Sequence, residues 1–294
     1  MELNDYLRDE ILEEADLGYI SVKERDRRLK AFDSALNGQL AGGVGTALLS
    51  AQTSTGNGKP EAVDTDIVTI RGKAKGKDSD VLTYLAKPKE GAALPGVIVI
   101  HENKGLVPYV EDVARRLARE GFVAVAPDLL SRRGGTGAFA DPADATTALG
   151  TISKDELVED LIAAVSYLAS DDSVQPERIG VIGFCFGGGM AWKLITKDSR
   201  LKAAVPFYGP NPPLEDVPDI KASVLAIYGG LDDRINAGID DIVSAMEQNG
   251  KEFEKIVYPG AQHAFHNDTN PDRYHPEAAA ASWERALEWL RRWL

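Results

Sequence analysis

An α/β fold, with a mainly parallel central sheet flanked by helices, is the architecture that the sequence predicts for residues 61–294. Short β-branched runs such as "GVIVI" (96–100) and "FVAVA" (122–126) are typical of strands that are buried on both faces. These runs alternate with segments whose apolar residues recur at helical spacing. Because such alternation places parallel strands beneath helices, we expect one domain without an internal linker.

The first elements predict an antiparallel hairpin that precedes the parallel strands. "DIVTIRG" (66–72) and "SDVLTYLAKP" (79–88) have strand composition and are separated by the polar stretch "KAKGKD". A buried strand is expected within 96–106. The helical pattern of 109–121 then ends at Gly121, a residue typical of helix C-termini.

The middle of the chain predicts a strand, a loop and a long helix. We expect a buried strand over 122–130, followed by a loop-rich excursion over 131–150. Ser153 and Glu156 are spaced as a capping box, which places the start of an amphipathic helix there.

The remaining segments continue the alternation to the end of the sequence. Strands are expected at 178–184, 202–209, 222–230 and 252–260, and helices at 188–197, 240–250 and 276–294.

Composition disfavours several classes of partner. The chain of 294 residues has a net charge of −13, which opposes binding to nucleic acid or an anionic membrane. Its single cysteine cannot form an internal disulfide or a cysteine metal cluster, and no apolar run reaches about 18 residues. We expect a cytoplasmic protein that acts on a small molecule and needs no metal or other cofactor.

Residues 1–60 are expected to form a helical N-terminal extension and a linker. Apolar residues in 1–20 have helical spacing, and Ser21 with Glu24 matches a capping box. The stretch 50–65 has linker composition. Two short helices cannot bury their apolar faces alone, so docking on residues 61–294 or on a second copy, as a homo-oligomer, is expected.

An export signal is the alternative interpretation of the same region. Arg27 and Arg28 form a twin arginine before a Gly-rich, weakly apolar stretch. Acidic residues surround the pair, which favours the helical extension.

The stretch "GVIGFCFGGG" (180–189) predicts a nucleophile at Cys185. A strand ends near Gly183 and a helix starts at about Phe186, so Cys185 occupies the bend, with glycines at 183 and 187. This is the pattern of a nucleophile elbow with Cys in place of Ser. The helix N-terminus favours the thiolate. The alternative is a small buried residue that only packs.

An acid and a base follow in the order that such a nucleophile requires. Asp232 lies just beyond a predicted strand, and His263 lies beyond the next one, so both reach the carboxyl edge of the sheet. Asp233 competes with Asp232 for the acid role. His101, His266 and His275 do not combine a strand end with this spacing.

Residues 66–294 resemble the dienelactone hydrolases (carboxymethylenebutenolidases), a cysteine-based branch of the α/β-hydrolase superfamily. The resemblance rests on "VIVIHENKGL", "GFVAVAPDLLSR", "IGVIGFCFGGGMA", "YGGLDDRI" and "YPGAQHAF". It implies an α/β-hydrolase fold that hydrolyses an ester or lactone through a thioester. The implied roles are Cys185 as nucleophile, Asp232 as acid and His263 as base.

The resemblance also implies roles for the loop after the strand at 96–100. Glu102 is expected to contact the resting thiol, where a carboxylate disfavours the thiolate until substrate binds. The backbone N–H groups of Asn103 and Phe186 would form the oxyanion hole.

The sequence departs from the family in the residues that bind a substrate carboxylate. The family places one arginine where this chain has Asn267, and another around 140–160, where this chain has none. We expect Arg132, Arg133 and Arg273 to be solvated surface charges, so the substrate-binding residues stay unknown. The alternatives in function are a catalytically silent binding protein and thiol redox chemistry, which the absence of a resolving cysteine disfavours.

Truncation tests the expected role of residues 1–60. If the extension docks on the catalytic domain or on a second copy, a chain that starts near residue 61 loses stability or halves its oligomeric mass. Size-exclusion chromatography with light scattering and thermal unfolding measure both quantities. Unchanged oligomeric state and unchanged stability would contradict the expectation.

Overall fold

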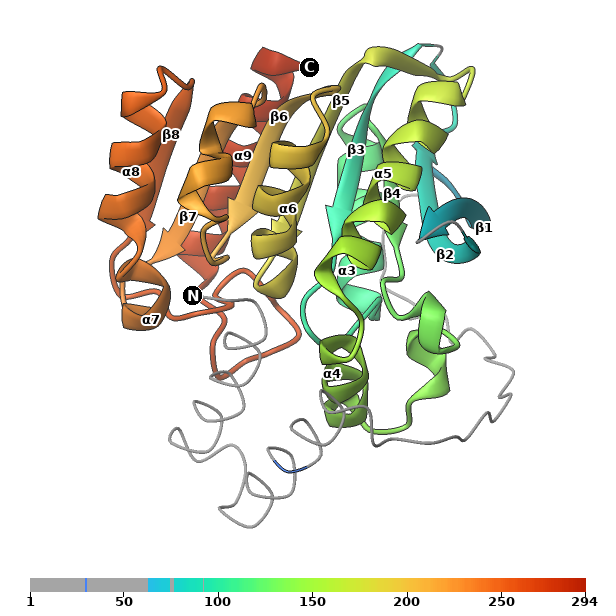
Figure 1. Ribbon diagram of the computed structural model, residues 1–294, viewed down its shortest axis with the longest axis horizontal. Helices are drawn as coiled ribbons and strands as arrows, with labels where there is room; N and C mark the ends of the chain where they lie inside the picture. Colours follow the sequence, from blue (N-terminus) through green and yellow to red (C-terminus); the bar gives the residue numbers. More distant parts are fainter. Residues whose placement is uncertain (1–29, 31–62, 75–76, 92) are drawn as a thin grey trace.

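The computed structural model describes Lys30 and residues 63–74, 77–91 and 93–294 (Figure 1). Apart from Lys30, the predicted extension 1–60 therefore lies outside the described residues, as do the twin arginine and most of the predicted linker.

Eight strands of the described chain form one sheet in the order β1-β2-β4-β3-β5-β6-β7-β8. β1 and β2 are antiparallel, β2 is antiparallel to β4, and the other neighbours are parallel. This confirms the predicted hairpin and the mainly parallel sheet. The strands are β1 (Val63–Ala74), β2 (Lys77–Pro88), β3 (Leu94–Ile100), β4 (Val123–Pro127), β5 (Val174–Phe184), β6 (Leu201–Phe207), β7 (Ser223–Gly229) and β8 (Phe253–Tyr258).

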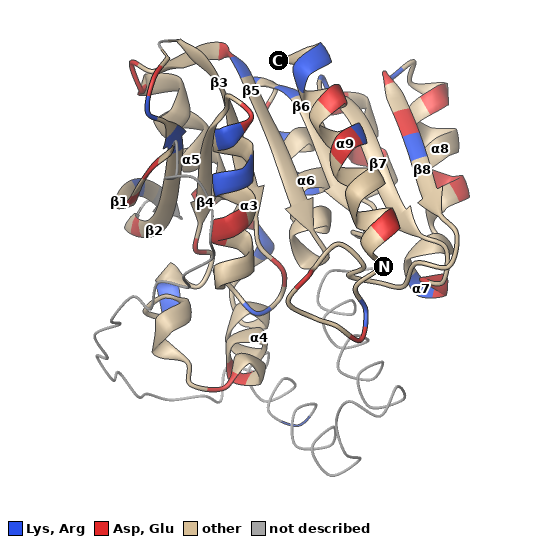
Figure 2. Cartoon of the chain, turned by 180° about the vertical axis from the view of Figure 1, so that it is seen from behind, with Lys and Arg blue, Asp and Glu red and all other residues tan. Residues whose placement is uncertain are grey.

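Helices cover both faces of the sheet. One face carries α5, α6 and α8, and the other carries α3 and α9 (Figures 1 and 2). All seven residues of β7 are buried, because side chains on both of its faces pack beneath helices. The helices are α3 (Pro108–Arg119), α4 (Pro142–Gly150), α5 (Lys154–Ser170), α6 (Phe186–Lys197), α7 (Asp233–Asn236), α8 (Ile239–Gln248) and α9 (Pro276–Trp293).

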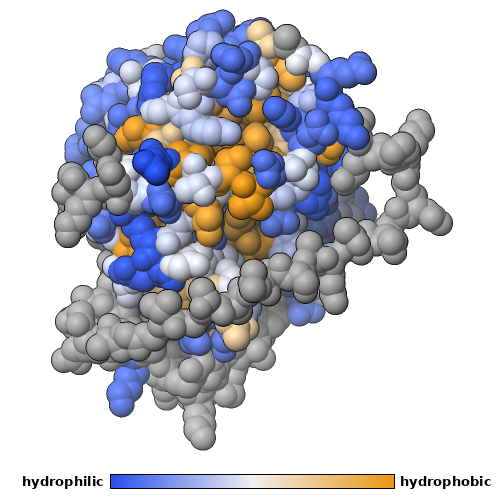
Figure 3. All heavy atoms as spheres, turned by 90° about the vertical axis from the view of Figure 1, so that its right-hand side faces the viewer, coloured by the Kyte–Doolittle hydropathy of each residue, from blue (hydrophilic) through white to orange (hydrophobic). Residues whose placement is uncertain are grey.

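The edge strand β1 begins earlier than predicted. Its pairing with β2 starts at Val63↔Pro88, inside the stretch 50–65 that was interpreted as linker. Polar side chains are compatible with an edge strand, which explains why composition alone was misleading. Figure 3 shows an apolar area on this side of the molecule, and Ile67 (57% exposed) and Leu82 (39%) are exposed apolar residues of the hairpin.

The prediction of a loop-rich excursion over 131–150 is wrong for its second half. α4 occupies Pro142–Gly150, after two 3₁₀ turns at Ser131–Arg133 and Thr136–Ala138. The Asp141 side chain accepts a hydrogen bond from the N–H of Ala143, and Pro142 fits the first turn. Small Ala and Thr side chains give this helix a weak apolar pattern, so the sequence carried little helical signal.

The bend between β5 and α6 matches the predicted elbow. Cys185 lies between the two elements with φ 56° and ψ −119°, a conformation that L-residues rarely adopt. A Cβ on Gly183 would lie 2.0 Å from the Gly187 carbonyl oxygen. A Cβ on Gly187 would lie 2.3 Å from the Ile100 carbonyl oxygen. Both glycines are therefore required for the close packing of the bend against the end of β3.

Alanine substitution of Gly187 tests this packing. The added Cβ meets backbone that cannot move aside, so we expect Gly187→Ala to lower the free energy of unfolding by about 3 kcal/mol. Gly121→Ala is the matched control, because Gly121 has φ +93° but its Cβ would meet nothing within 4 Å. It should cost about 1–2 kcal/mol through backbone strain alone. A Gly187→Ala protein that is as stable as the wild type in urea denaturation would show that the close approach at Gly187 has no energetic weight.

Candidate active site

The carboxyl ends of three parallel strands bring the predicted nucleophile, acid and base together. Cys185 follows β5, Asp232 follows β7 as the N-cap of α7, and His263 follows β8. All three residues are almost fully buried, at 2%, 4% and 2% exposure. The carboxyl edge is where open α/β sheets bind ligands.

His263 lies between Asp232 and Cys185. Its Nδ1 is 2.5 Å from Asp232 Oδ2, and it also forms a hydrogen bond with Cys185. Burial lowers the pKa of His263, but the charges of Asp232 and Cys185 outweigh burial and raise it well above its usual value. For Asp232 the effect of burial is the opposite and raises the pKa. The neighbouring His263 outweighs burial, so the pKa of Asp232 lies below its usual value. The charges that raise the pKa of His263 include that of the Cys185 thiolate, so Asp232 and the thiolate together stabilise the imidazolium that forms when the ring accepts the thiol proton.

The two candidate acids occupy different environments. The Asp232 carboxylate accepts from His263 and from the N–H of Ile235 at 3.3 Å. Asp233 is the first residue of α7 and is exposed to solvent. The structure thus brings Asp232, and not its neighbour, to the histidine.

Glu102 lies on the loop after β3 and is 7% exposed. Its Oε2 accepts a hydrogen bond from Asn267 Nδ2 at 2.7 Å. The Oδ1 of Asn267 accepts from the N–H of Thr269 at 3.0 Å and from its hydroxyl at 2.7 Å. A backbone N–H can only donate, so the amide orientation is fixed and Nδ2 must face Glu102. Sequence reasoning treated Asn267 only as a missing arginine, because only the fold shows this contact.

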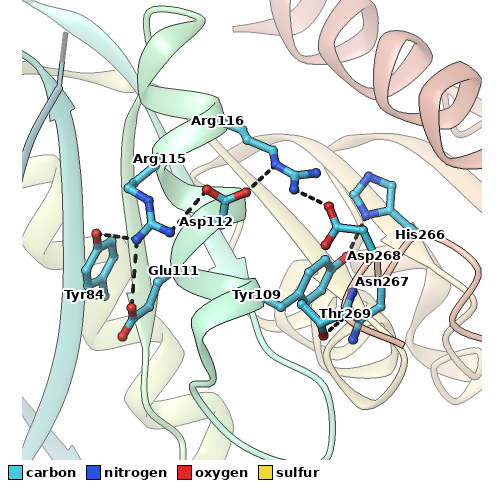
Figure 4. Close-up of polar contacts among 10 residues, drawn as sticks. All are labelled: Tyr84, Tyr109, Glu111, Asp112, Arg115, Arg116, His266, Asn267, Asp268 and Thr269. Carbon is cyan, nitrogen blue, oxygen red and sulfur yellow. Dashed lines mark hydrogen bonds and ion pairs between the residues drawn. The ribbon is translucent and has the colours of Figure 1, made fainter. Parts of the chain in front are cut away.

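Buried aromatic residues surround this region. The Tyr208 ring packs edge-on against His263, with ring centroids 5.1 Å apart. The Tyr109 hydroxyl lies 2.6 Å from His266 Nδ1 (Figure 4). Burial raises the pKa of both tyrosines well above its usual value, so both keep their protons. Sequence reasoning did not assign these residues to the site.

Helix α3 holds the loop that carries His266 and Asn267. Arg116 donates to Asp112 within α3 at 2.6 Å and to Asp268 in the loop at 2.5 Å (Figure 4). With the Tyr109–His266 contact, this gives α3 two polar connections to the loop. The loop after β8 is therefore held on both sides, by α3 and by Glu102.

The two expected oxyanion donors lie on adjoining segments. Asn103 follows β3, and Phe186 is the first residue of α6, where backbone N–H groups have no acceptor within the helix. A Cβ on Gly187 would lie 2.5 Å from the His101 carbonyl oxygen, which shows how closely the two segments approach. The Thr146 hydroxyl of α4 donates to the Asn103 carbonyl at 3.3 Å.

Two of the three arginines expected on the surface are not solvated charges. Arg132 donates to both oxygens of the buried Asp160, at 2.8 and 2.7 Å. Arg273 is only 7% exposed. Arg133 is exposed, as predicted, and contacts Thr151. The ion pair with Asp160 joins residues far apart in sequence, which explains why residue type alone was misleading.

Metal ligands are not grouped in the part of the chain that the structure describes: no three His, Cys, Asp or Glu side chains there come together in a way that could hold an ion. The described helices also include none that is long and apolar enough to cross a bilayer.

The buried neutral His266 predicts a specific dependence of stability on pH. Burial, assisted by the charge of Arg116, lowers its pKa from 6.5 to about 3. The unfolded chain therefore takes up the proton first, and stability is lost as pH falls below 6.5. From pH 7.5 to 4.5 this group should remove about 2–3 kcal/mol from the free energy of unfolding.

His266→Asn isolates this contribution, because the Asn amide lies where Nδ1 lies and still offers Tyr109 a hydrogen-bond partner but does not titrate. In urea denaturation, the free energy of unfolding of the wild type minus that of the variant should decrease by that amount between pH 7.5 and pH 4.5. A wild-type-minus-variant difference that does not change with pH would contradict a neutral His266.

Comparison with known proteins places this chain and its fold in a family. The family model of the dienelactone hydrolases matches residues 81–294. A provisionally named carboxymethylenebutenolidase of Methylorubrum extorquens is 33% identical over 254 residues, covering 80% of this chain and 87% of the relative. One from Escherichia coli O157:H7 is 35% identical over 223 residues, covering 71% and 82%.

A solved structure agrees with these relatives. The crystal structure of a provisionally named dienelactone hydrolase from Klebsiella pneumoniae superposes with a TM-score of 0.71 at 30% identity, covering 79% of this chain and all of that one. With the eight-stranded sheet and its flanking helices, these matches show that the chain belongs to the dienelactone hydrolase family and has the α/β-hydrolase fold.

Proposed function

We propose that residues 61–294 form a catalytic domain that hydrolyses a carboxylic ester or lactone with Cys185 as the nucleophile. Family membership supports a hydrolase of the lactone type. The observation that carries the cysteine mechanism is the buried series Cys185–His263–Asp232, with the thiol on a strained turn at the start of α6.

The first half-reaction forms a thioester. Because Nδ1 of His263 is bonded to Asp232, the other ring nitrogen takes the proton from the Cys185 thiol. The thiolate attacks the substrate carbonyl carbon, and the resulting oxyanion accepts hydrogen bonds from the N–H groups of Asn103 and Phe186. The C–O bond to the leaving alkoxide then breaks, and the histidine returns the proton to that oxygen.

The second half-reaction restores the enzyme. His263 takes a proton from water, the hydroxide attacks the thioester carbonyl, and the C–S bond breaks. The carboxylic acid leaves and the thiol is protonated again. Asp232 supports both halves, because its charge stabilises the imidazolium that forms each time the histidine accepts a proton.

Glu102 is proposed to protect the resting thiol. A carboxylate beside a thiol disfavours the thiolate, so the nucleophile becomes reactive when substrate displaces the glutamate. The hydrogen bond from Asn267 supports this role, since it holds Glu102 in the buried site. The same bond occupies the amide of Asn267, so we expect uncharged esters or lactones as substrates.

Kinetics on p-nitrophenyl esters, from acetate to octanoate, test the proposal. Cys185→Ala should abolish turnover, because the bond-forming atom is removed. Asp232→Asn should lower kcat by about 100-fold or more, since the amide cannot stabilise the imidazolium. The profile across chain lengths measures the acyl group that the site accepts.

Asp233→Asn is the matched control, because the exposed neighbour carries the same charge change without contacting His263. It should retain wild-type kcat. Equal turnover by wild type and Cys185→Ala would refute Cys185 as the nucleophile. A wild type without turnover on any ester or on a carboxylate-bearing lactone would favour a catalytically silent binding protein.

A further inference from the structure

His101 is a fully buried histidine that the catalytic steps above do not use. It directly follows β3 and is 0% exposed. Its Nδ1 is 2.6 Å from the Glu102 carbonyl oxygen, and its Nε2 is 3.0 Å from the backbone nitrogen of Leu129, beyond β4. The ring therefore bridges the loops that follow two neighbouring strands.

The two contacts fix the tautomer of this ring. The N–H of Leu129 can only donate, so Nε2 must carry the lone pair. The Glu102 carbonyl can only accept, so Nδ1 must carry the proton. Burial lowers the pKa of His101, against the opposing charge of Asp128, and this agrees with a neutral ring.

The accepted carbonyl belongs to the same peptide unit as the N–H of Asn103. That unit is planar and trans, so its C=O and N–H point in opposite directions. Fixing the Glu102 carbonyl toward His101 therefore also fixes the direction of the Asn103 N–H, away from the imidazole. Rotation of this single plane would misdirect the donor without moving any catalytic side chain.

We propose that His101 is a positioning residue that aims the Asn103 N–H at the oxyanion by holding the Glu102 carbonyl. The inference rests on the proposed function, in which Asn103 supplies one oxyanion donor. Donors of this kind accelerate the reaction only when they are held in place before charge develops.

Further contacts of the same loop agree with this role. The N–H of Gly105 also donates to the Glu102 carbonyl, but at the longer distance of 3.3 Å. The His101 ring lies nearly parallel to the ring of Phe186, with centroids 6.4 Å apart and planes 17° apart. His101 therefore contacts the peptide unit that includes the Asn103 N–H and the side chain of Phe186, whose N–H is the other expected donor.

Two amide variants separate the contacts of the ring. The amide of Asn lies where Nδ1 lies, so His101→Asn keeps a donor for the Glu102 carbonyl and loses the acceptor for Leu129. The amide of Gln reaches the Nε2 position, so His101→Gln keeps the acceptor and loses the donor. Gln also fills more of the buried volume, so packing alone would favour His101→Gln.

The rates of two reactions at Cys185 distinguish a positioning role of His101 from a general effect on structure. Acylation by p-nitrophenyl acetate builds an oxyanion, whereas alkylation by iodoacetamide does not. The chain has one cysteine, so peptide mapping by mass spectrometry locates both products at Cys185 or elsewhere. Rates are measured below the melting transition of each variant, with thermal unfolding recorded in parallel.

We expect His101→Gln to slow acylation by about 10- to 100-fold while alkylation stays within about twofold of wild type. His101→Asn should acylate within about fivefold of wild type, even though it is the less stable variant. Equal acylation rates in the two variants, or parallel loss of acylation and alkylation, would overturn the role of His101. A wild type that forms no thioester at Cys185 would instead refute the proposed function, and this inference with it.

Discussion

The strained backbone of Cys185 is the constraint on which the arrangement of the site depends. A non-glycine residue at φ 56° and ψ −119° costs on the order of 1–3 kcal/mol, and it persists only where the surroundings leave no alternative. Here Gly183 packs against Gly187, and Gly187 packs against the end of β3. The same contacts bring the start of α6 against the loop that carries Glu102 and Asn103. The thiol and both expected oxyanion donors are thus positioned by one close backbone contact.

A second layer of buried contacts connects the loops around this turn. The hydrogen bond from Asn267 to Glu102 joins the loop after β8 to the loop after β3. His101 joins the loop after β3 to the loop after β4. Each contact pairs a side chain with a partner whose hydrogen-bonding role is fixed, so the loops have little freedom to shift. Loops that are joined by such hydrogen bonds can hold hydrogen-bond donors at the position where charge develops, and preorganised catalysis requires this.

The parts of this account that were predictable from sequence are local ones. The glycines around Cys185, the capping box at Ser153 and the buried strands each lie within a few consecutive residues. The contacts of Asn267 with Glu102 and of Arg132 with Asp160 join residues 165 and 28 positions apart, and no local sequence pattern predicts them. α4 escaped prediction because its small side chains give almost no apolar periodicity. Polar contacts between residues far apart in sequence could therefore be identified only from the folded structure.

The most direct test of the account is to trap the covalent intermediate. Wild-type protein is mixed with p-nitrophenyl acetate, quenched in acid within the first turnover and digested for mass spectrometry. We predict a gain of one acetyl group on the peptide that contains Cys185, and its absence in Cys185→Ala. Turnover without that adduct under conditions where deacylation limits the rate, or acetyl transfer to another side chain during turnover, would contradict the cysteine mechanism.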